Sequence, residues 1–296
     1  DPTLWNAEQP YLYTLTLQAG AETIEQKVGI RWISVEEGKI LINGKQVKFR
    51  GVNRHDSNPY TGATVTREDV IRDLQLMKES NVNAIRTSHY PNAPYFPVLC
   101  SEYGFYMIAE ADLESHGVGT LYTNDGHDCM GYIAQDDAWA ESILDRQKRN
   151  VIRDKNQSAV IFWSLGNESG YGGNFEDAGR WVKAYDPTRL LHYEASIYNS
   201  AGYHNDVSML DVMSRMYADT EWVKEYCEDR RMRKPFIQCE FIHAMGNGPG
   251  DIHDYMELMY KYDKFCGGFV WEWCDHATWE LSLIHISEPT RLDVIS

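Results

Sequence analysis

The sequence predicts a parallel (β/α)8 barrel that follows the last part of an all-β module. Short alternating runs and an Asn-Gly turn signal lie near the start of the chain. From about residue 48, eight short apolar runs follow, mostly separated by amphipathic helical segments, over roughly 230 residues, close to the ~250 typical of such barrels. We therefore divide the chain into the C-terminal part of a β-sandwich domain (1–47), a barrel domain without its last helix (48–280) and a non-native tail (281–296).

The first module is predicted from residues 11–47. YLYTLTLQ at 11–18 alternates apolar and polar residues, as a half-buried strand does. ILINGKQV at 40–47 contains Asn43 and Gly44, and an Asn-Gly pair is the strongest short signal for a two-residue hairpin turn. These strands are too few to bury a core, so we expect part of an immunoglobulin-like sandwich that is incomplete by itself.

Eight runs are predicted as barrel strands. They are KFRGVN (48–53), AIRTSH (84–89), FYMIAEAD (105–112), VIFWSLG (160–166), LLHYEA (190–195), DVMSRMY (211–217), PFIQCEF (235–241) and GGFVWEW (267–273). The predicted helices are residues 66–80, 93–104, 136–155, 175–185, 220–229 and 251–262. A closed barrel is favoured over an open doubly wound sheet, because no GxGxxG follows the first strand. No helix follows the eighth run, so we expect the outer wall beside the first and eighth strands to be bare.

The first barrel helix has clear boundary signals. Thr66 is the expected N-cap, with Asp69 three residues later as its capping partner. Val70, Leu74 and Met77 recur at helical spacing and define the face that should be buried.

Charge and composition exclude several classes of partner. The net charge is −16 and the pI is about 5.0, which argues against nucleic acid and against an anionic membrane surface. No run approaches the ~18–20 uninterrupted apolar residues of a membrane span. The six cysteines are scattered without a CxxC pair, which favours a reduced, cytoplasmic setting. The last residues, LSLIHISEPTRLDVIS, break the preceding composition and resemble the translated read-through of a sequencing adapter.

Ionisable and aromatic residues are concentrated where the predicted strands end, and parallel barrels carry their active sites at this end. These residues are Asn53, Arg54, His55, His89, Glu110, Asp112, Glu114, His116, Asn167, Glu168, Tyr217, Glu240, His243, Trp271, Trp273 and Asp275. Glu168 and Glu240 stand out because each ends an apolar run, on the fourth and seventh strands, which lie across the barrel mouth from each other. Most glycoside hydrolases use two carboxylic residues that face each other across the bond to be cleaved. Two members of structural ion pairs are the alternative that the spacing leaves open.

Several motifs resemble those of glycoside hydrolase family two, and most closely those of its large bacterial β-galactosidases. They are GVNRH (51–55), RTSHYPN (86–92), ESHG (114–117), WSLGNESG (163–170), CEFIHAMGN (239–247) and GGFVWEW (267–273). DPTLWNAEQPYLYTL at the start resembles the end of the jelly-roll and immunoglobulin-like region that precedes the family's barrel. The resemblance runs in order from residue 1 to about residue 280.

The resemblance implies a retaining hydrolase of terminal β-D-galactosyl residues that acts through a covalent galactosyl-enzyme. Glu168 would be the general acid/base and Glu240 the nucleophile, with carboxyls ~5–5.5 Å apart. The residues implied in substrate binding are His55, His89, Asn167, Tyr217, His243 and Trp271. Asn167 would contact the sugar 2-hydroxyl, Tyr217 would lie beside the nucleophile, and Trp271 would be the platform under galactose. The histidines would contact sugar hydroxyls, and Tyr217 and Arg86 would keep the nucleophile ionised.

A metal site and further partners are implied in the same way. Glu114, His116 and Glu168 match the family's Mg²⁺ ligands, and oxygen-rich sets suit that ion. The spacing of Glu114 and His116 alone favours a solvated loop over a metal site. The family's Na⁺ site needs parts outside this sequence, so we expect it to be incomplete here. The family's oligomers also form through other parts, so the whole protein is expected to be a homo-oligomer, and no assembly is predicted for this segment.

Other activities remain alternatives. A β-glucuronidase or β-mannosidase of the same family is one, although no Asn-x-Lys follows Glu240 to bind a uronic carboxylate. A catalytically dead sugar-binding barrel is a second, and a metal-dependent hydrolase that uses Glu114 and His116 is a third.

Overall fold

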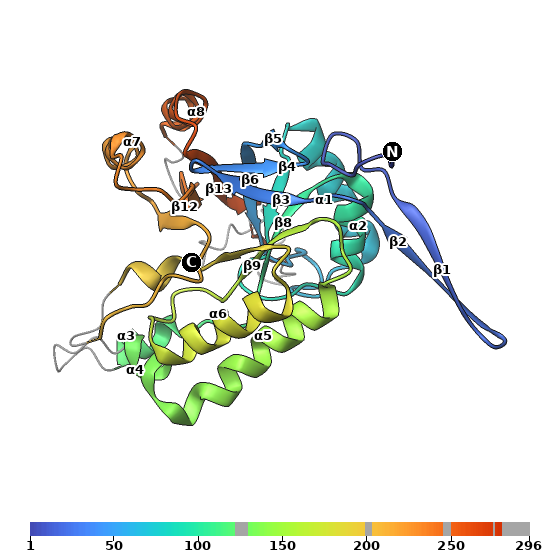
Figure 1. Ribbon diagram of the computed structural model, residues 1–296, viewed down its shortest axis with the longest axis horizontal. Helices are drawn as coiled ribbons and strands as arrows, with labels where there is room; N and C mark the ends of the chain where they lie inside the picture. Colours follow the sequence, from blue (N-terminus) through green and yellow to red (C-terminus); the bar gives the residue numbers. More distant parts are fainter. Residues whose placement is uncertain (122–129, 199–202, 245–249, 275, 280–296) are drawn as a thin grey trace, which may run out of the picture.

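A sheet of eight parallel strands forms the centre of the molecule and curls into a nearly closed barrel (Figure 1). The computed structural model describes residues 1–121, 130–198, 203–244, 250–274 and 276–279, so Asp275 and the tail predicted at 281–296 lie outside the described part. The barrel strands are β6 (Phe49–Arg54), β7 (Ala84–Arg86), β8 (Tyr106–Glu110), β9 (Val160–Ser164), β10 (Leu190–His192), β11 (Met213–Met216), β12 (Phe236–Phe241) and β13 (Phe265–Trp273). They fall within or overlap the eight predicted runs, and the predicted barrel is confirmed.

The barrel closes between its first and last strands and leaves a seam between β10 and β11. β6 pairs with β13, and the strand order is β10-β9-β8-β7-β6-β13-β12-β11. Across the seam, the Asp211 N–H donates to the Leu191 carbonyl over 3.0 Å, and the Asp211 carboxylate accepts from the Leu191 N–H over 2.6 Å. His192 Nε2 lies 2.9 Å from Ser214 Oγ. Side chains therefore supply much of the hydrogen bonding between β10 and β11 that the backbone supplies between the other neighbouring strands of the barrel.

The predicted helices surround the sheet (Figure 1). They are α1 (Arg67–Glu79), α2 (Tyr95–Tyr103), α5 (Ala140–Asp154), α6 (Gly173–Tyr185), α7 (Thr220–Glu228) and α8 (Ile252–Lys261). Thr66 and Asp69 form the predicted capping box of α1, and Val70, Leu74 and Met77 form its buried face. None of the helices in the described ranges is long and apolar enough to cross a membrane.

Most of the short helical elements were not predicted; only η2 falls inside a predicted helix, at 136–155. α3 (His116–Leu121), α4 (Met130–Gln135) and the 3-10 turn η2 (Asp137–Trp139) lie between β8 and α5, and the 3-10 turn η3 (Glu194–Ile197) follows β10. Each has about two turns or fewer, which is too short for helical periodicity to show in the sequence.

The first 47 residues contain two small antiparallel sheets. β1 (Tyr13–Ala19) and β2 (Glu22–Val28) form a hairpin that extends away from the barrel (Figure 1). β3 (Ile33–Glu36), β4 (Lys39–Ile42) and β5 (Lys45–Gln46) form the second sheet. Asn43 and Gly44, with φ of 55° and 75°, form the predicted turn between β4 and β5. Trp5 joins this region to the barrel, because its buried indole donates to the Ser101 carbonyl over 2.9 Å.

The outer face of β6 and β13 is open in the part of the chain that the structure describes. A groove of about 450 Å³ lies there between α8 and the segment after α1. Its apolar lining includes Val52, Phe241, Met256 and Val270.

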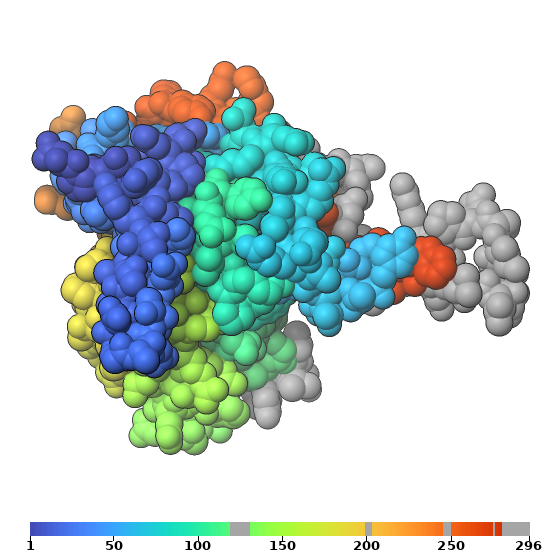
Figure 2. Space-filling view, turned by 90° about the vertical axis from the view of Figure 1, so that its right-hand side faces the viewer, coloured from blue at the N-terminus to red at the C-terminus, as the bar shows by residue number. Residues whose placement is uncertain are grey.

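The segments that follow β6 and β13 project together from the mouth side of the barrel. Figure 2 shows them in light blue and red at one side of the molecule. The Trp279 N–H donates to the Pro59 carbonyl over 2.7 Å, and the rings of Tyr60 and Trp279 lie 5.9 Å apart.

Candidate active site

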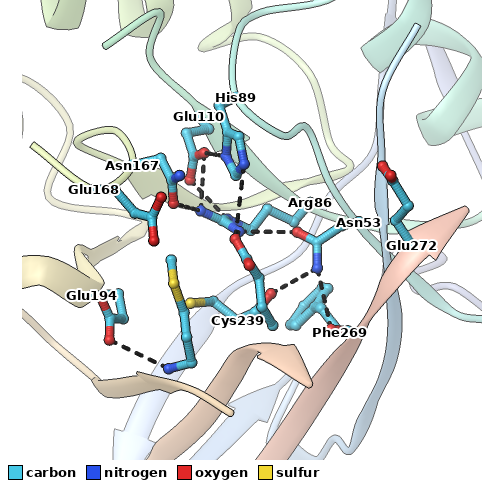
Figure 3. Close-up of polar contacts among 12 residues, drawn as sticks. Asn53, Arg86, His89, Glu110, Asn167, Glu168, Glu194, Cys239, Phe269 and Glu272 are labelled. Carbon is cyan, nitrogen blue, oxygen red and sulfur yellow. Dashed lines mark hydrogen bonds and ion pairs between the residues drawn. The ribbon is translucent and has the colours of Figure 1, made fainter. Parts of the chain in front are cut away.

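Arg86 is at the centre of the polar contacts at the barrel mouth (Figure 3). It ends β7, and its side chain is 0% exposed. Its Nη1 donates to Glu240 Oε1 over 2.8 Å, and its Nη2 donates to Asn167 Oδ1 over 2.8 Å. Asn167 directly precedes Glu168. One guanidinium therefore connects the ends of β7, β9 and β12 and places both predicted carboxylate residues at the same mouth.

Glu110 balances the charge of Arg86. Its carboxylate is 0% exposed at the end of β8 and accepts from Arg86 Nε and Nη2 over 2.8 and 3.0 Å. It also lies 2.7 Å from His89 Nδ1 and accepts from Ser164 Oγ over 2.7 Å. Burial alone would raise the pKa of Glu110, but Arg86 and His89 outweigh burial and lower it to about 2. Arg86 and Glu110 thus form a permanently ionised pair at neutral pH.

Glu240 is buried on β12 and has a donor on each carboxylate oxygen. Arg86 occupies Oε1, and the Tyr217 hydroxyl donates to Oε2 over 3.0 Å. His89 Nε2 lies 3.8 Å from Oε1. Burial and the neighbouring Glu240 raise the pKa of the Tyr217 phenol, so it keeps its proton and remains a donor. This arrangement suits an ionised carboxylate that acts as a nucleophile.

The backbone that carries these groups departs from regular strand geometry. Glu168 and Tyr217 have φ of 35° and 51°, a region that residues other than glycine rarely occupy. The register of β12 shifts against both neighbouring strands near Glu240. At Gly166, with φ of 139°, a Cβ would lie 2.6 Å from the Leu113 carbonyl oxygen, so a side chain is excluded. The strand ends leave the ladder and direct their side chains into the mouth.

Glu168 also belongs to a more exposed group with Glu114 and His116. One ligand atom from each residue lies within 4.8 Å of the others, and His116 Nδ1 is 2.5 Å from Glu168 Oε2. Asn167 Nδ2 donates to Glu114 Oε2 over 2.5 Å, which links this group to Arg86. The hydrogen bond with Glu168 raises the pKa of His116, and burial raises the pKa of Glu114. Two carboxylates and one imidazole can hold a hard divalent cation that retains several waters.

Trp271 forms an aromatic wall with three histidines. The His89 ring is stacked on Trp271 with centroids 5.3 Å apart, and the His55 ring meets it edge-on at 5.6 Å. The His243 ring lies 6.4 Å from Trp271 and 6.1 Å from Tyr217. Burial lowers the pKa of His55 to about 4, so its imidazole is neutral at pH 7. A flat apolar face bordered by polar ring edges can receive a sugar ring.

Every predicted site residue belongs to one connected group. These are the two carboxylates Glu168 and Glu240, the binding residues His55, His89, Asn167, Tyr217, His243 and Trp271, and the metal candidates Glu114 and His116.

Sequence reasoning missed Glu194, a 3% exposed carboxyl at the end of the fifth predicted strand. An ionisable residue that closes an apolar run is the signal that could have found it. Glu272 was also missed. Its Oε2 lies 4.0 Å from His55 Nε2, and its Oε1 lies 3.2 Å from His276 Nε2.

Comparison with known proteins identifies the relatives of this chain. Residues 33–285 match the family described as "Glycosyl hydrolases family 2, TIM barrel domain", and residues 1–31 match "Glycosyl hydrolases family 2". A β-galactosidase of Actinobacillus pleuropneumoniae is 50% identical over 298 residues, which cover 94% of this chain and 30% of that protein. A β-galactosidase of Staphylococcus xylosus is 46% identical, with 94% and 28% covered. The chain thus spans less than a third of the length of these relatives.

Solved structures share the fold. A Ruminococcus gnavus β-glucuronidase superposes with a TM-score of 0.74 at 21% identity, over 95% of this chain and 54% of that chain. A β-D-glucuronidase described for Dictyoglomus thermophilum superposes with a TM-score of 0.69 at 25% identity, over 97% and 55%.

Proposed function

This chain belongs to the glycosyl hydrolases of family 2, and from that premise we propose that the protein containing it is a retaining β-galactosidase. The observation that carries the proposal is the contact of Arg86 with both Glu240 and Asn167, the residue before Glu168. The β-galactosidase relatives at 50% and 46% identity support the substrate class. The proposed reaction removes terminal β-D-galactosyl residues with retention at the anomeric carbon.

In the first step, a Glu240 oxygen attacks the anomeric carbon while Glu168 donates its proton to the departing oxygen. The glycosidic C–O bond breaks, an ester bond to Glu240 forms, and the leaving group departs as a neutral alcohol. Arg86 and Tyr217 orient the Glu240 carboxylate for this attack. The Glu168 side chain is 36% exposed, which allows a leaving group to reach it from solvent.

In the second step, Glu168 acts as a base. Esterification removes the negative charge of Glu240, and the ionised Glu168 takes a proton from a water molecule. That water attacks the anomeric carbon, the ester bond breaks, and galactose leaves while Glu168 is again protonated. One pair of carboxyls thus serves both halves of the reaction.

Asn167 and Trp271 are proposed to position the sugar. The Asn167 Oδ1 accepts from Arg86 and one amide hydrogen goes to Glu114, so the second amide hydrogen is left to donate to the 2-hydroxyl. Trp271 supplies a face for galactose, and His55, His89 and His243 lie around it to contact hydroxyls. These contacts would strengthen as the ring distorts in the transition state.

We also propose that Glu114, His116 and Glu168 hold Mg²⁺. Their donor set and mutual spacing support this, because hard oxygen ligands predominate. When bound, the cation would supply positive charge beside Glu168. The family's Na⁺ site is expected to be incomplete in this segment.

A β-glucuronidase is the second candidate. It is favoured by the superposition on solved β-glucuronidases, although identity there is only 21–25%. A uronic substrate needs cationic groups for its carboxylate, and the sequence after Glu240 offers no Asn-x-Lys.

Location and assembly are part of the same proposal. We place the protein in the cytoplasm, with support from the buried free thiols of Cys100, Cys227, Cys239 and Cys266. We propose that the whole protein is a homo-oligomer, which size-exclusion chromatography of the full-length protein tests.

The decisive experiment measures the full-length protein on aryl β-galactoside, β-glucuronide and β-mannoside, with and without Mg²⁺. Galactoside turnover that EDTA reduces and Mg²⁺ restores is expected. Preference for the glucuronide would favour the second candidate. Absence of turnover in a well-folded protein would assign the chain to sugar binding, and complete loss in EDTA would favour a metal-dependent hydrolase.

A further inference from the structure

One buried carboxyl at the barrel mouth has no role in the reaction proposed above. Glu194 begins η3, after the end of β10, and is 3% exposed (Figure 3). Burial raises its pKa to about 7, and the Met216 N–H only partly offsets this effect. A buried acid is unfavourable for folding unless its contacts compensate, so its partners indicate what it is for.

The partner of Glu194 lies across the seam of the barrel. The Met216 N–H donates to Glu194 Oε1 over 3.3 Å. Met216 ends β11, and the register between β11 and β12 shifts between Arg215 and Met216. β10 and β11 do not pair as strands, so the Glu194 side chain supplies an acceptor where a neighbouring strand would normally offer a carbonyl.

Tyr217 follows Met216 and binds the predicted nucleophile twice. Its N–H donates to the Glu240 carbonyl over 2.9 Å, and its hydroxyl donates to Glu240 Oε2 over 3.0 Å. Tyr217 adopts a φ of 51°, which is unfavourable for a bulky residue unless its surroundings fix it. The bond from Met216 to Glu194 fixes the residue immediately before this strained position.

Glu194 is itself held in place by the preceding residue. The Tyr193 ring is buried and stacks on Phe175 with centroids 4.7 Å apart. Its hydroxyl donates to the Gly170 carbonyl over 2.8 Å. Glu194 therefore projects from a rigid point toward the end of β11.

We propose that Glu194 is a positioning residue whose carboxyl oxygen accepts the Met216 N–H and thereby holds the Tyr217 hydroxyl on Glu240. This inference rests on the proposed function, because it takes Glu240 as the nucleophile. Glu194 touches neither the sugar nor the reacting atoms in this proposal. Its effect depends on the length of its side chain, which must bring the carboxyl oxygen across the seam to the Met216 N–H.

Two conservative substitutions separate the effect of the side-chain length of Glu194 from the effect of its charge. Glu194→Gln keeps the length and an acceptor oxygen but removes the charge, whereas Glu194→Asp keeps the charge and withdraws the oxygen by one methylene. For Glu194→Asp we expect kcat to fall about tenfold, the factor for one lost hydrogen bond, with KM within about twofold. Glu194→Gln should retain kcat within about threefold. Glu176→Asp is the matched control, because buried Glu176 accepts the Asp206 N–H over 2.8 Å on α6.

A double-mutant cycle with Tyr217→Phe tests the route of the effect in the full-length protein. If Glu194 acts through Tyr217, Glu194→Asp should cost less than about twofold in kcat in the Tyr217→Phe background, since coupled residues are non-additive. Equal losses in both backgrounds, a Gln variant weaker than the Asp variant, or losses no larger than in Glu176→Asp would each overturn the proposal. A wild type that hydrolyses no galactoside would instead overturn the proposed function, and this inference with it.

Discussion

Replacing Arg86 by methionine should destabilise the barrel more than any surface charge change. Arg86 is 0% exposed and makes two bonds to Glu110 and one each to Glu240, Asn53 and Asn167. Its removal leaves the buried Glu110 carboxylate without its permanently charged partner. Breaking one side of a buried ion pair in this way lowers the free energy of unfolding by about 3–5 kcal/mol.

The assay is urea unfolding of the full-length protein, followed by tryptophan fluorescence at pH 7. Arg180→Met is the control, because the Arg180 side chain is half exposed and its two shortest ion pairs, with Asp177 and Asp206, are exposed, whereas its contact with the mostly buried Glu176 is longer, at 3.3 Å. Exposed pairs contribute about 0–1 kcal/mol. Adding Glu110→Gln to Arg86→Met should recover part of the loss, since it removes the unpaired buried charge. Equal effects of Arg86→Met and Arg180→Met, or no recovery in the double variant, would refute the reasoning.

The pH dependence gives a second check with a defined sign. In the wild type, Arg86 and His89 lower the pKa of Glu110 to about 2 from 4.5. Its stabilising contribution is fully present above pH 4.5 and is lost progressively as the pH falls from 4.5 through about 2. In Arg86→Met, burial should instead raise the pKa of Glu110, so the variant should gain stability relative to the wild type between pH 7 and 5. A deficit that is constant with pH would contradict this assignment.

Four further outcomes are expected. Glu240→Gln should reduce galactoside turnover to background, because no other side chain can form the glycosyl ester; measurable wild-type-like kcat would contradict the nucleophile assignment. Glu168→Gln should reduce kcat/KM at least about 100-fold for alkyl galactosides but much less for activated aryl galactosides, which need little protonation; equal losses would argue against an acid role. His116→Ala should raise the Mg²⁺ concentration needed for half-maximal stimulation by roughly tenfold or more, measured by titration after EDTA treatment; an unchanged midpoint would remove His116 from the site. Burial raises the pKa of Glu194 to about 7 from 4.5. The stabilising contribution of this carboxyl is therefore present below pH 4.5, and roughly 3 kcal/mol of it is lost as the pH rises through 7. Thermal unfolding across this pH range should show a flatter decline in stability for Glu194→Gln.

Local patterns in the sequence predicted the order and type of the main elements. The capping box of Thr66 and Asp69, the apolar face of α1 and the Asn43–Gly44 turn are short-range features, and each appears as predicted. The short helices α3 and α4 were missed, because neither extends over enough turns to show a period.

The candidate site was predictable because a parallel barrel brings all strand ends to one mouth. Carboxylates and aromatic residues that interrupt apolar runs therefore had to meet there, as Glu240, His89 and Trp271 do. The resemblance to known motifs supplied the roles, which periodicity could not. The contact of Glu194 with Met216 was not predictable, because it depends on a seam that the sequence does not reveal.

The sequence by itself determined the alternation of strands and helices, the two carboxylates at the ends of the fourth and seventh strands, and the family. The tertiary structure decided that Arg86 joins Glu240 to Asn167, that the barrel seam falls between β10 and β11, and that Glu194 reaches Met216 across it. The division has a physical reason. Turns, caps and periods depend on neighbours along the chain, whereas register shifts and buried hydrogen bonds depend on how distant strands pack, and a shift of one residue changes which side chains meet.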